Sequence, residues 1–252
     1  MKITFNGTGS STGTPQLFCS CPVCTSESPE NKRTRFSITI IEGETSIQID
    51  APFEIRQQLL NAKIRKIDAL WLTHAHSDHI AGIDDLRMVS FENNSPLPLF
   101  AGAETIEILN TRFPYLFFEN DYRETPLFKP VAINKRPFEF KNITFIPIEY
   151  FHGETVVNSF RIKDFAFLVD ISGISQHELE KLKGAKVIAV SATTKFPHKK
   201  HKSLNQIIEL IDEISPERAF LTHMNHSFDY LKIKKELPAN VFPAFDGLTL
   251  EI

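Results

Sequence analysis

The chain has little of what marks secreted, membrane-spanning or nucleic-acid-coating proteins. Its 252 residues include only three cysteines, an odd number crowded between positions 19 and 24, so paired disulfides cannot use them all. No apolar run approaches the roughly 18 residues that a membrane span needs. Residues 1–7 resemble a strand rather than the apolar part of a signal peptide. The formal net charge of −3 gives no support for bulk binding to nucleic acid or anionic membranes.

We therefore expect a cytoplasmic enzyme with no nucleic-acid or membrane partner. The hydrophobic fraction of 42% is ordinary for a globular protein. No low-complexity tract or long linker divides the chain, and we expect a single domain over residues 1–252.

Short β-rich runs come first along the chain, and helical patterns alternate with strands after them. Predicted strands include residues 2–5, 36–42, 45–50, 69–73, 97–101, 131–134, 143–148, 157–162, 165–170, 186–190, 219–222 and 249–252. Predicted helices cover residues 52–62, 207–214 and 228–237, and Ser175 and Ser203 each open a capping-box pattern. This order favours sheets with helices packed outside them.

The densest group of chemically distinctive residues is the run Thr73-His74-Ala75-His76-Ser77-Asp78-His79. It places three imidazoles and one carboxylate within six residues, and each is a good ligand for a zinc-like or manganese-like ion. Residues 67–73 read as a buried strand, and residues 80–87 begin like a helix. The potential ligands therefore lie on a strand-to-helix turn, where a rigid scaffold commonly holds catalytic groups.

Several potential ligands share one kind of place in the predicted fold. Each lies at or after the carboxyl end of a predicted strand: Asp50, His74, His152, Asp170 and His223. Histidines scattered through a core or over a surface would not share that placement.

This inventory fits a centre for two divalent ions. The two alternating histidines of the turn project to the same side of an extended chain, so one ion would be held by His74, His76 and His152. The second ion would be held by Asp78, His79 and His223. Asp170, a carboxylate that is costly to bury without a partner, would bridge the two. Two ions about 3.5–4 Å apart can activate a water and polarise a phosphoryl or carbonyl oxygen.

The run at residues 73–79 resembles the signature of the metallo-β-lactamase superfamily, and Asp50, His152, Asp170 and His223 match its other motifs in order. The resemblance spans nearly the whole chain. It implies an α+β fold, a four-layer αβ/βα sandwich with the metals at one edge, between the two sheets. It also implies hydrolysis, without fixing the substrate.

The three cysteines form a second group within a predicted zinc-binding loop at residues 15–30: Cys19, Cys21 and Cys24. A structural zinc ion usually has four ligands, and His226, three residues after His223, is the best fourth. A zinc ion there would tie the N-terminal loop to the loop of His223. The alternative is three free thiols and an unrelated histidine.

This pairing resembles the phosphodiesterases of bacterial carbon–phosphorus lyase (phosphonate degradation) pathways. The similar segments are Gly7-Thr8-Gly9, Gly13-Thr14-Pro15, the cysteine cluster, Leu221-Thr222-His223-x-x-His226-x-Phe228-Asp229 and Phe245-Asp246-Gly247. The resemblance implies hydrolysis of phosphodiesters, notably the cyclic phosphate of a phosphorylated ribose, with Mn or Zn. It also implies a homodimer, for which residues 113–118 would supply an apolar contact. A biosynthesis protein of the pyrroloquinoline quinone pathway shares the cysteine cluster.

His201 matches the family's position for an active-site histidine that is not a metal ligand, and His201 and Asp78 are the predicted catalytic residues. His201 would protonate a departing alkoxide or hold a phosphate oxygen. The lysines beside it would favour an anionic substrate: Lys199, Lys200 and Lys202. The alternative is a solvated basic loop.

The sequence departs from the family in one segment. Ser191 stands where the family usually has Asp, and the following Ala192-Thr193-Thr194 replaces a Cys-Ser-His run. We therefore expect the hydrogen bonds that orient the metal ligands to differ here.

The sequence thus predicts a metal-dependent phosphodiesterase for small linear or cyclic substrates, with two catalytic divalent metals (Mn or Zn) and one structural Zn. Other hydrolases of the same fold are alternatives: an RNA 3′-processing nuclease, a lactonase or a thioesterase. The nuclease would need a basic or Gly/Pro-rich arm that the sequence lacks. A non-enzymatic metal-binding protein of cofactor biosynthesis is the last alternative, and it would need neither the bridging Asp170 nor His201.

Overall fold

A computed structural model describes residues 1–119 and 125–252. Within these residues the strands form two seven-stranded sheets. The first sheet has the order β14 (Thr249–Glu251), β1 (Lys2–Gly7), β2 (Ser37–Glu42), β3 (Thr45–Ile49), β4 (Ala69–Trp71), β5 (Leu97–Ala101) and β6 (Phe128–Ala132). The second has the order β13 (Val241–Pro243), β12 (Arg218–Thr222), β11 (Val187–Ser191), β10 (Phe165–Leu168), β9 (Thr155–Ile162), β8 (Ile143–His152) and β7 (Phe138–Phe140).

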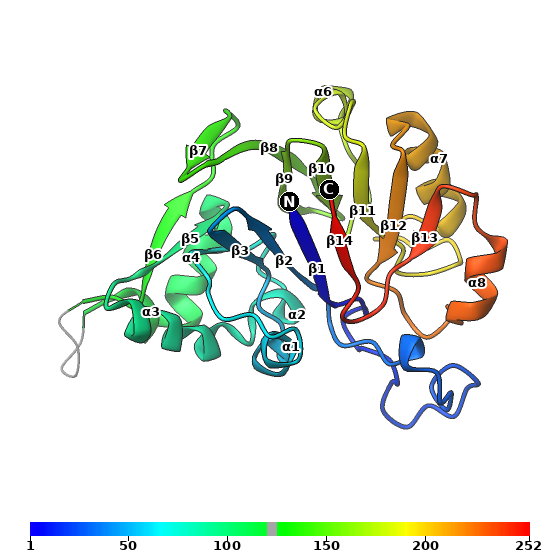
Figure 1. Cartoon of the computed structure of the whole chain (residues 1–252), viewed down its shortest axis with the longest axis horizontal. Helices are drawn as coiled ribbons and strands as arrows, with labels where there is room; N and C mark the ends of the chain where they lie inside the picture. The colour runs from blue at the N-terminus through cyan, green and yellow to red at the C-terminus, as the bar shows by residue number, and fades with distance from the viewer. Residues whose placement is uncertain (120–124) are drawn as a thin grey trace.

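Helices cover the outer sides of both sheets (Figure 1). Beside the first sheet lie α1 (Ile55–Asn61), α2 (Ser77–Ile80), α3 (Arg87–Asn93), α4 (Ala103–Arg112) and α5 (Pro114–Phe117). Beside the second lie α6 (Gln176–Glu180), α7 (Leu204–Ile214) and α8 (Tyr230–Glu236). The predicted four-layer sandwich is confirmed. None of the helices in the described residues is both long and apolar enough to span a membrane.

The alternation of side chains along the strands explains the two apolar cores. In β1, Ile3 and Phe5 are fully buried and join residues of β2, β3 and the second sheet in one cluster. The other face of β4 and β5 contributes Leu70 and Leu99 to a second cluster beneath α1 to α4. Each sheet therefore buries both faces, as a helix-covered sheet requires.

Several predicted elements differ from the structure. The helix expected at residues 80–87 is broken into α2, a 3₁₀ turn at Ile83–Leu86 and α3. Gly82 separates the first two, where a Cβ atom would lie 2.0 Å from the Pro52 carbonyl oxygen. The strand expected at 131–134 is displaced to Phe128–Ala132, and α4, α5, β7 and β13 were missed. The 3₁₀ turn η1 (Pro29–Asn31) lies in the long loop that follows β1.

The parallel strands deliver the chemically active residues to one edge. Strands β3, β4, β5 and β6 run parallel in the first sheet, and β10, β11, β12 and β13 run parallel in the second. Their carboxyl ends meet between the sheets, so loops that are distant in sequence converge there.

Candidate metal centre

Three of the site residues follow strand ends in an uncommon backbone conformation. Asp50 follows β3, Asp170 follows β10 and His223 follows β12, with φ angles of 56°, 55° and 55°. The left-handed region disfavours residues with a Cβ atom by about 1–2 kcal/mol. Such conformations persist where the surrounding structure fixes them, and they concentrate at functional sites.

The carboxylate of Asp170 is the hub of the site. One oxygen, Oδ2, lies 3.0 Å from His79 Nε2 and 3.8 Å from His74 Nε2. The other, Oδ1, lies 3.4 Å from His223 Nδ1 and 3.5 Å from His201 Nδ1. Asp170 is only 2% exposed. A carboxylate with imidazoles on both oxygens is the geometry expected of a bridging ligand.

Asp78 completes one side of this arrangement. Its Oδ2 lies 3.3 Å from His79 Nε2 and 3.5 Å from His223 Nε2. One ligand atom from each member of a four-residue set lies within 4.8 Å of the others: Asp78, His79, Asp170 and His223. This is the set predicted for the second ion together with its bridge.

The other side of Asp170 differs in part from the prediction. His74 and His76 have rings 4.5 Å apart, and the His76 ring lies 5.2 Å from that of His152. The three predicted histidines are therefore neighbours. The compact set on this side, however, consists of His152, Asp170 and His201. Geometry thus groups His201 with two potential metal ligands, whereas the sequence pattern treats it as a non-ligand.

Three of the candidate ligand histidines have a hydrogen-bond partner on Nδ1. His79 Nδ1 donates to Asp50 Oδ2 over 2.6 Å, and His152 Nδ1 donates to the Lys200 carbonyl over 3.0 Å. Both rings then present an Nε2 lone pair, the form that binds metal. The Thr73 hydroxyl donates to Asp50 and so accepts from His74 Nδ1 at 3.0 Å. The same tautomer follows for His74.

The segment after Ser191 contributes one contact to the site. Thr193, in the segment that departs from the family, places its hydroxyl 3.2 Å from His223 Nδ1. A hydroxyl from β11's loop thus contacts a ring that Asp170 also contacts.

Electrostatics favour a cation at the hub. Burial opposes ionisation of Asp78 and Asp170, but neighbouring histidines prevail and hold the pKa of both carboxyls well below the usual range. Burial lowers the pKa of His74 well below its ordinary value. Burial acts in the same direction on His79, yet Asp78 and Asp50 raise the pKa of His79 well above its ordinary value. Buried carboxylates surrounding an imidazole attract a positive charge, whether a proton or a metal ion.

The donor set fits divalent metal ions. Several buried atoms that face this hub have no hydrogen-bond partner within residues 1–119 and 125–252: Nε2 of His74, His79 and His223, and Oδ1 of Asp170. Buried polar atoms are rarely left without partners. Imidazole and carboxylate together suit zinc and manganese. These residues could hold two ions that share Asp170.

His201 lies at the rim, in the loop between β11 and α7. Its ring is 17% exposed and lies 4.7 Å from that of His152 and 5.1 Å from that of His198. Burial lowers the pKa of His201 to about 4. Lys199 and Lys200 are exposed, and Lys202 is half-buried. The loop thus presents cations beside the hub.

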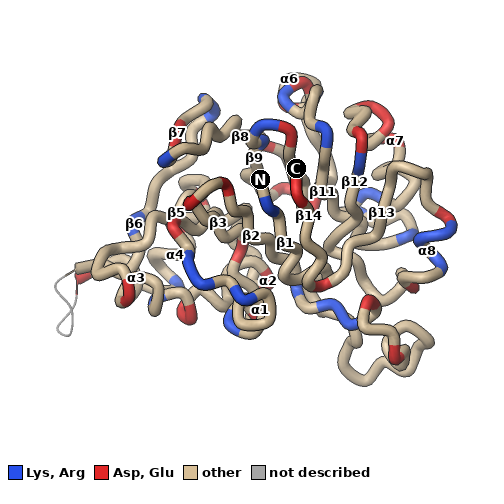
Figure 2. Tube along the Cα trace, viewed as in Figure 1, with Lys and Arg blue, Asp and Glu red and all other residues tan. Residues whose placement is uncertain are grey.

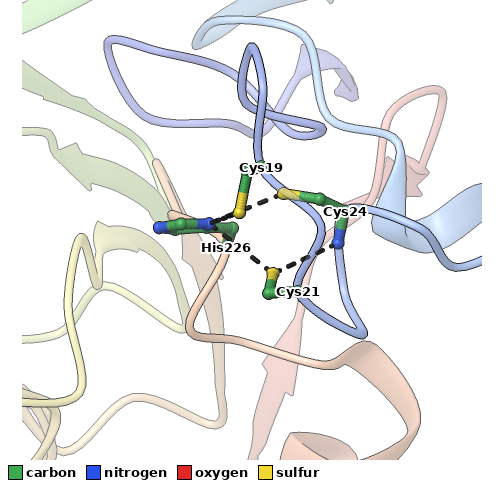
Figure 3. A group of neighbouring side chains, drawn as sticks. All are labelled: Cys19, Cys21, Cys24 and His226. Carbon is green, nitrogen blue, oxygen red and sulfur yellow. Dashed lines mark hydrogen bonds between the residues drawn. The ribbon is translucent and has the colours of Figure 1, made fainter.

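The three cysteines converge on His226 (Figure 3). Their sulfur atoms lie 3.2, 3.7 and 3.5 Å from His226 Nδ1 for Cys19, Cys21 and Cys24. The Cys24 backbone N–H lowers the pKa of the Cys21 thiol to about 6, and burial raises that of Cys24 to about 11. Three sulfurs around one ring nitrogen fit a tetrahedral zinc ion.

Sequence reasoning missed the groups that orient the ligands. The hydroxyls of Thr73 and Thr193 and the carbonyl of Lys200 carry no motif of their own. The sequence matched Asp50 to a family motif but did not indicate which residue it contacts. In the structure its carboxylate accepts a hydrogen bond from His79. A polar residue directly beside a predicted ligand, such as Thr73, was the available signal.

These features define a class of protein, and comparison with known proteins agrees. The model of the beta-lactamase superfamily domain matches residues 45–224. The chain belongs to this superfamily.

More particular likenesses follow from individual relatives. The crystal structure of a diphosphatase from the PhnP family is 31% identical, with a TM-score of 0.93, and covers 100% of this chain and 96% of that one. An octanoyltransferase of Porphyromonas gingivalis is 33% identical over 98% of this chain. This chain spans only 51% of that relative's length. Zinc-bound PqqB from Methylobacterium extorquens shares the fold over 100% of both chains, at 20% identity and a TM-score of 0.81.

Proposed function

We propose that the protein hydrolyses small phosphoric esters, either phosphodiesters or diphosphates, with two divalent ions (Mn or Zn) at the Asp170 hub. The observation that carries this proposal is the arrangement around Asp170. Its carboxylate lies between histidines on both of its oxygens, with the Asp78 carboxylate nearby. Such ions supply Lewis acidity that activates water and neutralises charge on phosphoryl oxygens. The likeness to a diphosphatase from the PhnP family supports a phosphorus-containing substrate.

The residues of the chain would divide the remaining work. We assign the first ion to His74, His76 and His152, and the second to Asp78, His79 and His223. Asp78 also orients His79 and His223 through its Oδ2 atom. His201, whose pKa is lowered to about 4 by burial, would act as a neutral imidazole that donates a hydrogen bond to the leaving oxygen. Exposed Lys199 and Lys200 would attract the anionic substrate.

The cysteine group would hold one structural zinc ion. We propose Cys19, Cys21, Cys24 and His226 as its ligands, within a loop at residues 15–30. Together with the two catalytic ions, this zinc ion would bring the total to about three ions per chain.

A substrate screen tests the proposal. Protein loaded with Mn or with Zn would be assayed on bis(p-nitrophenyl) phosphate, cyclic ribose phosphates and a dinucleoside diphosphate. Turnover of at least one is expected, and inactivity on all of them with either metal would refute the proposal. A His201→Ala variant should turn over more slowly yet keep both catalytic ions. Loss of those ions would instead make His201 a ligand.

The octanoyltransferase relative favours a second candidate, hydrolysis of an acyl thioester or ester. The same screen should therefore include octanoyl thioesters and a lactone. Faster turnover of these than of every phosphoric ester would make an acyl substrate the better assignment. A gel shift with precursor tRNA at two salt concentrations addresses the nuclease, because specific RNA binding weakens steeply with salt. The charges give no reason to expect binding, since basic and acidic segments are interspersed along the trace (Figure 2).

A homodimer remains a prediction. Of residues 113–118, Leu116 and Phe117 are buried within the chain. Tyr115 and Phe118 are 47% and 53% exposed and remain available for contact. Light scattering of a Tyr115→Ser/Phe118→Ser variant beside the unaltered protein would test this contact.

A further inference from the structure

Arg33 is a buried cation with an unusual set of partners. It is 1% exposed. Its guanidinium donates to the Phe228 carbonyl over 2.8 Å, to Asn31 Oδ1 over 3.1 Å and to the Asn225 carbonyl over 3.4 Å. All three of these partners are neutral, and within residues 1–119 and 125–252 its Nε atom has no hydrogen-bond partner.

Stability alone does not account for this arrangement. Burial lowers the pKa of Arg33 to about 10, against the opposing fields of Asp246 and Asp229. Removing a charge from water is costly even when a carboxylate lies in contact. Neutral carbonyls recover less of that cost than a carboxylate does.

The guanidinium acts on one loop. Asn225 and Phe228 lie in the loop between β12 and α8, and Asn225 stands between His223 and His226 in the sequence. The guanidinium therefore holds the backbone that carries one histidine into the hub and another into the cysteine group.

Asn31 strengthens the same attachment. Its Oδ1 accepts from the Tyr230 N–H over 2.9 Å, in addition to Arg33. Its Nδ2 donates to Asp229 Oδ2 over 3.3 Å and to Ser26 Oγ over 3.1 Å. Through Asn31 and Arg33, the segment that follows the cysteines is therefore hydrogen-bonded to the loop at several points between Asn225 and Tyr230.

The opposite side of the loop is held by the main chain. Met224 N–H donates to the Thr8 carbonyl over 2.9 Å, and Asn225 N–H donates to the Thr193 carbonyl over 3.2 Å. Thr193 is also the residue whose hydroxyl contacts His223. The loop is thus held both by Thr8 and Thr193, which follow strand ends, and by Arg33.

We propose that Arg33 is a positioning residue shared by the hub and the cysteine group, which sets His223 and His226 at once through the carbonyls of Asn225 and Phe228. The inference rests on the metal-binding roles proposed above. It concerns metal affinity and geometry rather than the identity of the substrate.

The test compares Arg33→Met with Arg161→Met. Arg161 is a matched control, because its guanidinium also donates to backbone carbonyls. These carbonyls belong to Lys163, Lys181 and Lys183, so the bonds join β9 to the residues after α6 and do not involve the loop of His223. Metal affinity would be measured by chelator competition, and the cysteine group by the thiolate absorption of the cobalt-substituted protein. Turnover on bis(p-nitrophenyl) phosphate would separate kcat from KM.

Arg33→Met should weaken one hub ion and the cysteine-bound ion by about 10- to 100-fold, the range for losing a group that orients ligands. The cobalt spectrum should change, and kcat should fall with little change in KM. Arg161→Met should leave all of these as in the unaltered protein. Arg33→Lys, which keeps the charge but not the fork of donors, should recover part of the loss.

Folded Arg33→Met protein with unaltered affinities and an unaltered cobalt spectrum would overturn the inference. Asn31→Ala is the second variant, should Arg33→Met fail to fold. It removes the attachment to Tyr230 and Asp229, and should weaken the same two ions by a smaller factor. Unchanged affinities in both Asn31→Ala and Arg33→Lys would also overturn the inference. Absence of ions at the hub of the unaltered protein would refute the proposed function instead.

Discussion

The hub around Asp170 and the cysteine group both gather metal-binding side chains, yet they are built differently. The hub residues follow the ends of strands in both sheets, and His74, His79 and Asp50 are fully buried. The cysteines lie in one short loop, where Cys19 and Cys21 are half-buried and only Cys24 is buried. The hub is therefore fixed by the fold, whereas the cysteine group depends on the loop of His226 and on the zinc ion proposed for it.

The second difference lies in the outer partners. In the hub, three imidazoles have an Nδ1 partner of their own: Asp50 for His79, the Lys200 carbonyl for His152 and the Thr73 hydroxyl for His74. In the cysteine group, the three sulfurs surround a single nitrogen of His226. Removing one hydrogen-bond partner of a hub histidine should therefore reduce activity only in part. Removing one thiol should abolish metal binding at the cysteine group.

The largest effect is expected from Asp170→Asn. The amide cannot bridge two ions with two anionic oxygens, so both ions should weaken. We expect kcat/KM to fall by about 100- to 1,000-fold, as when one electrostatic group of a catalytic centre is lost. Metal analysis and hydrolysis assays would measure this, with circular dichroism as a control for folding. An active variant with two hub ions would show that Asp170 is not the hub.

Asp50→Asn should have the next largest effect. It removes the carboxylate that accepts from His79 Nδ1 and from the Thr73 backbone N–H, the latter over 2.9 Å. Loss of such an outer partner reduces metal affinity or activity by about 10- to 100-fold. Chelator competition would measure it. An unchanged affinity would mean that the fold alone, without this partner, orients the His79 ring.

Cys24→Ser should separate the two regions. We expect one ion per chain to be lost and cleavage within residues 15–30 by added protease to become faster. Activity should fall by less than about tenfold, because the hub ligands are held by strand ends rather than by this ion. Elemental analysis and limited proteolysis would measure the change. Loss of all three ions would show that the hub depends on the cysteine group.

Thr193→Val should have the smallest effect. It replaces the hydroxyl near His223 Nδ1 with a methyl group of similar size. A typical hydrogen bond contributes about 1 kcal/mol, so we expect a few-fold weaker binding of one ion. Isothermal titration with the metal would detect it. A loss as large as that of Asp50→Asn would mean that the Thr193 hydroxyl orients its histidine as strongly as Asp50 orients His79.

Local patterns in the sequence were sufficient for some of these features. Ser203 and Gln206 form the predicted cap of α7, where the Ser203 N–H donates to Gln206 Oε1 over 2.9 Å. Ser175 caps α6 by accepting from the Glu178 N–H. Both depend on residues three positions apart, so neighbouring sequence contains all the information. Strand β6 begins three residues before the predicted strand because its bounds are set by pairing with β5. This pairing exists only in the folded sheet.

The sequence by itself determined the inventory of candidate ligands and their placement after strands, because hydrophobic alternation and polar strand ends are local properties. It also indicated the pairing of the cysteines with His226. Tertiary structure alone decided which atoms meet: Asp170 against four imidazoles, Asp50 behind His79, and Arg33 beneath the loop of His223. These contacts join residues 29 to 195 positions apart. No local pattern specifies such distances, since they arise when two sheets bring their strand ends to one edge.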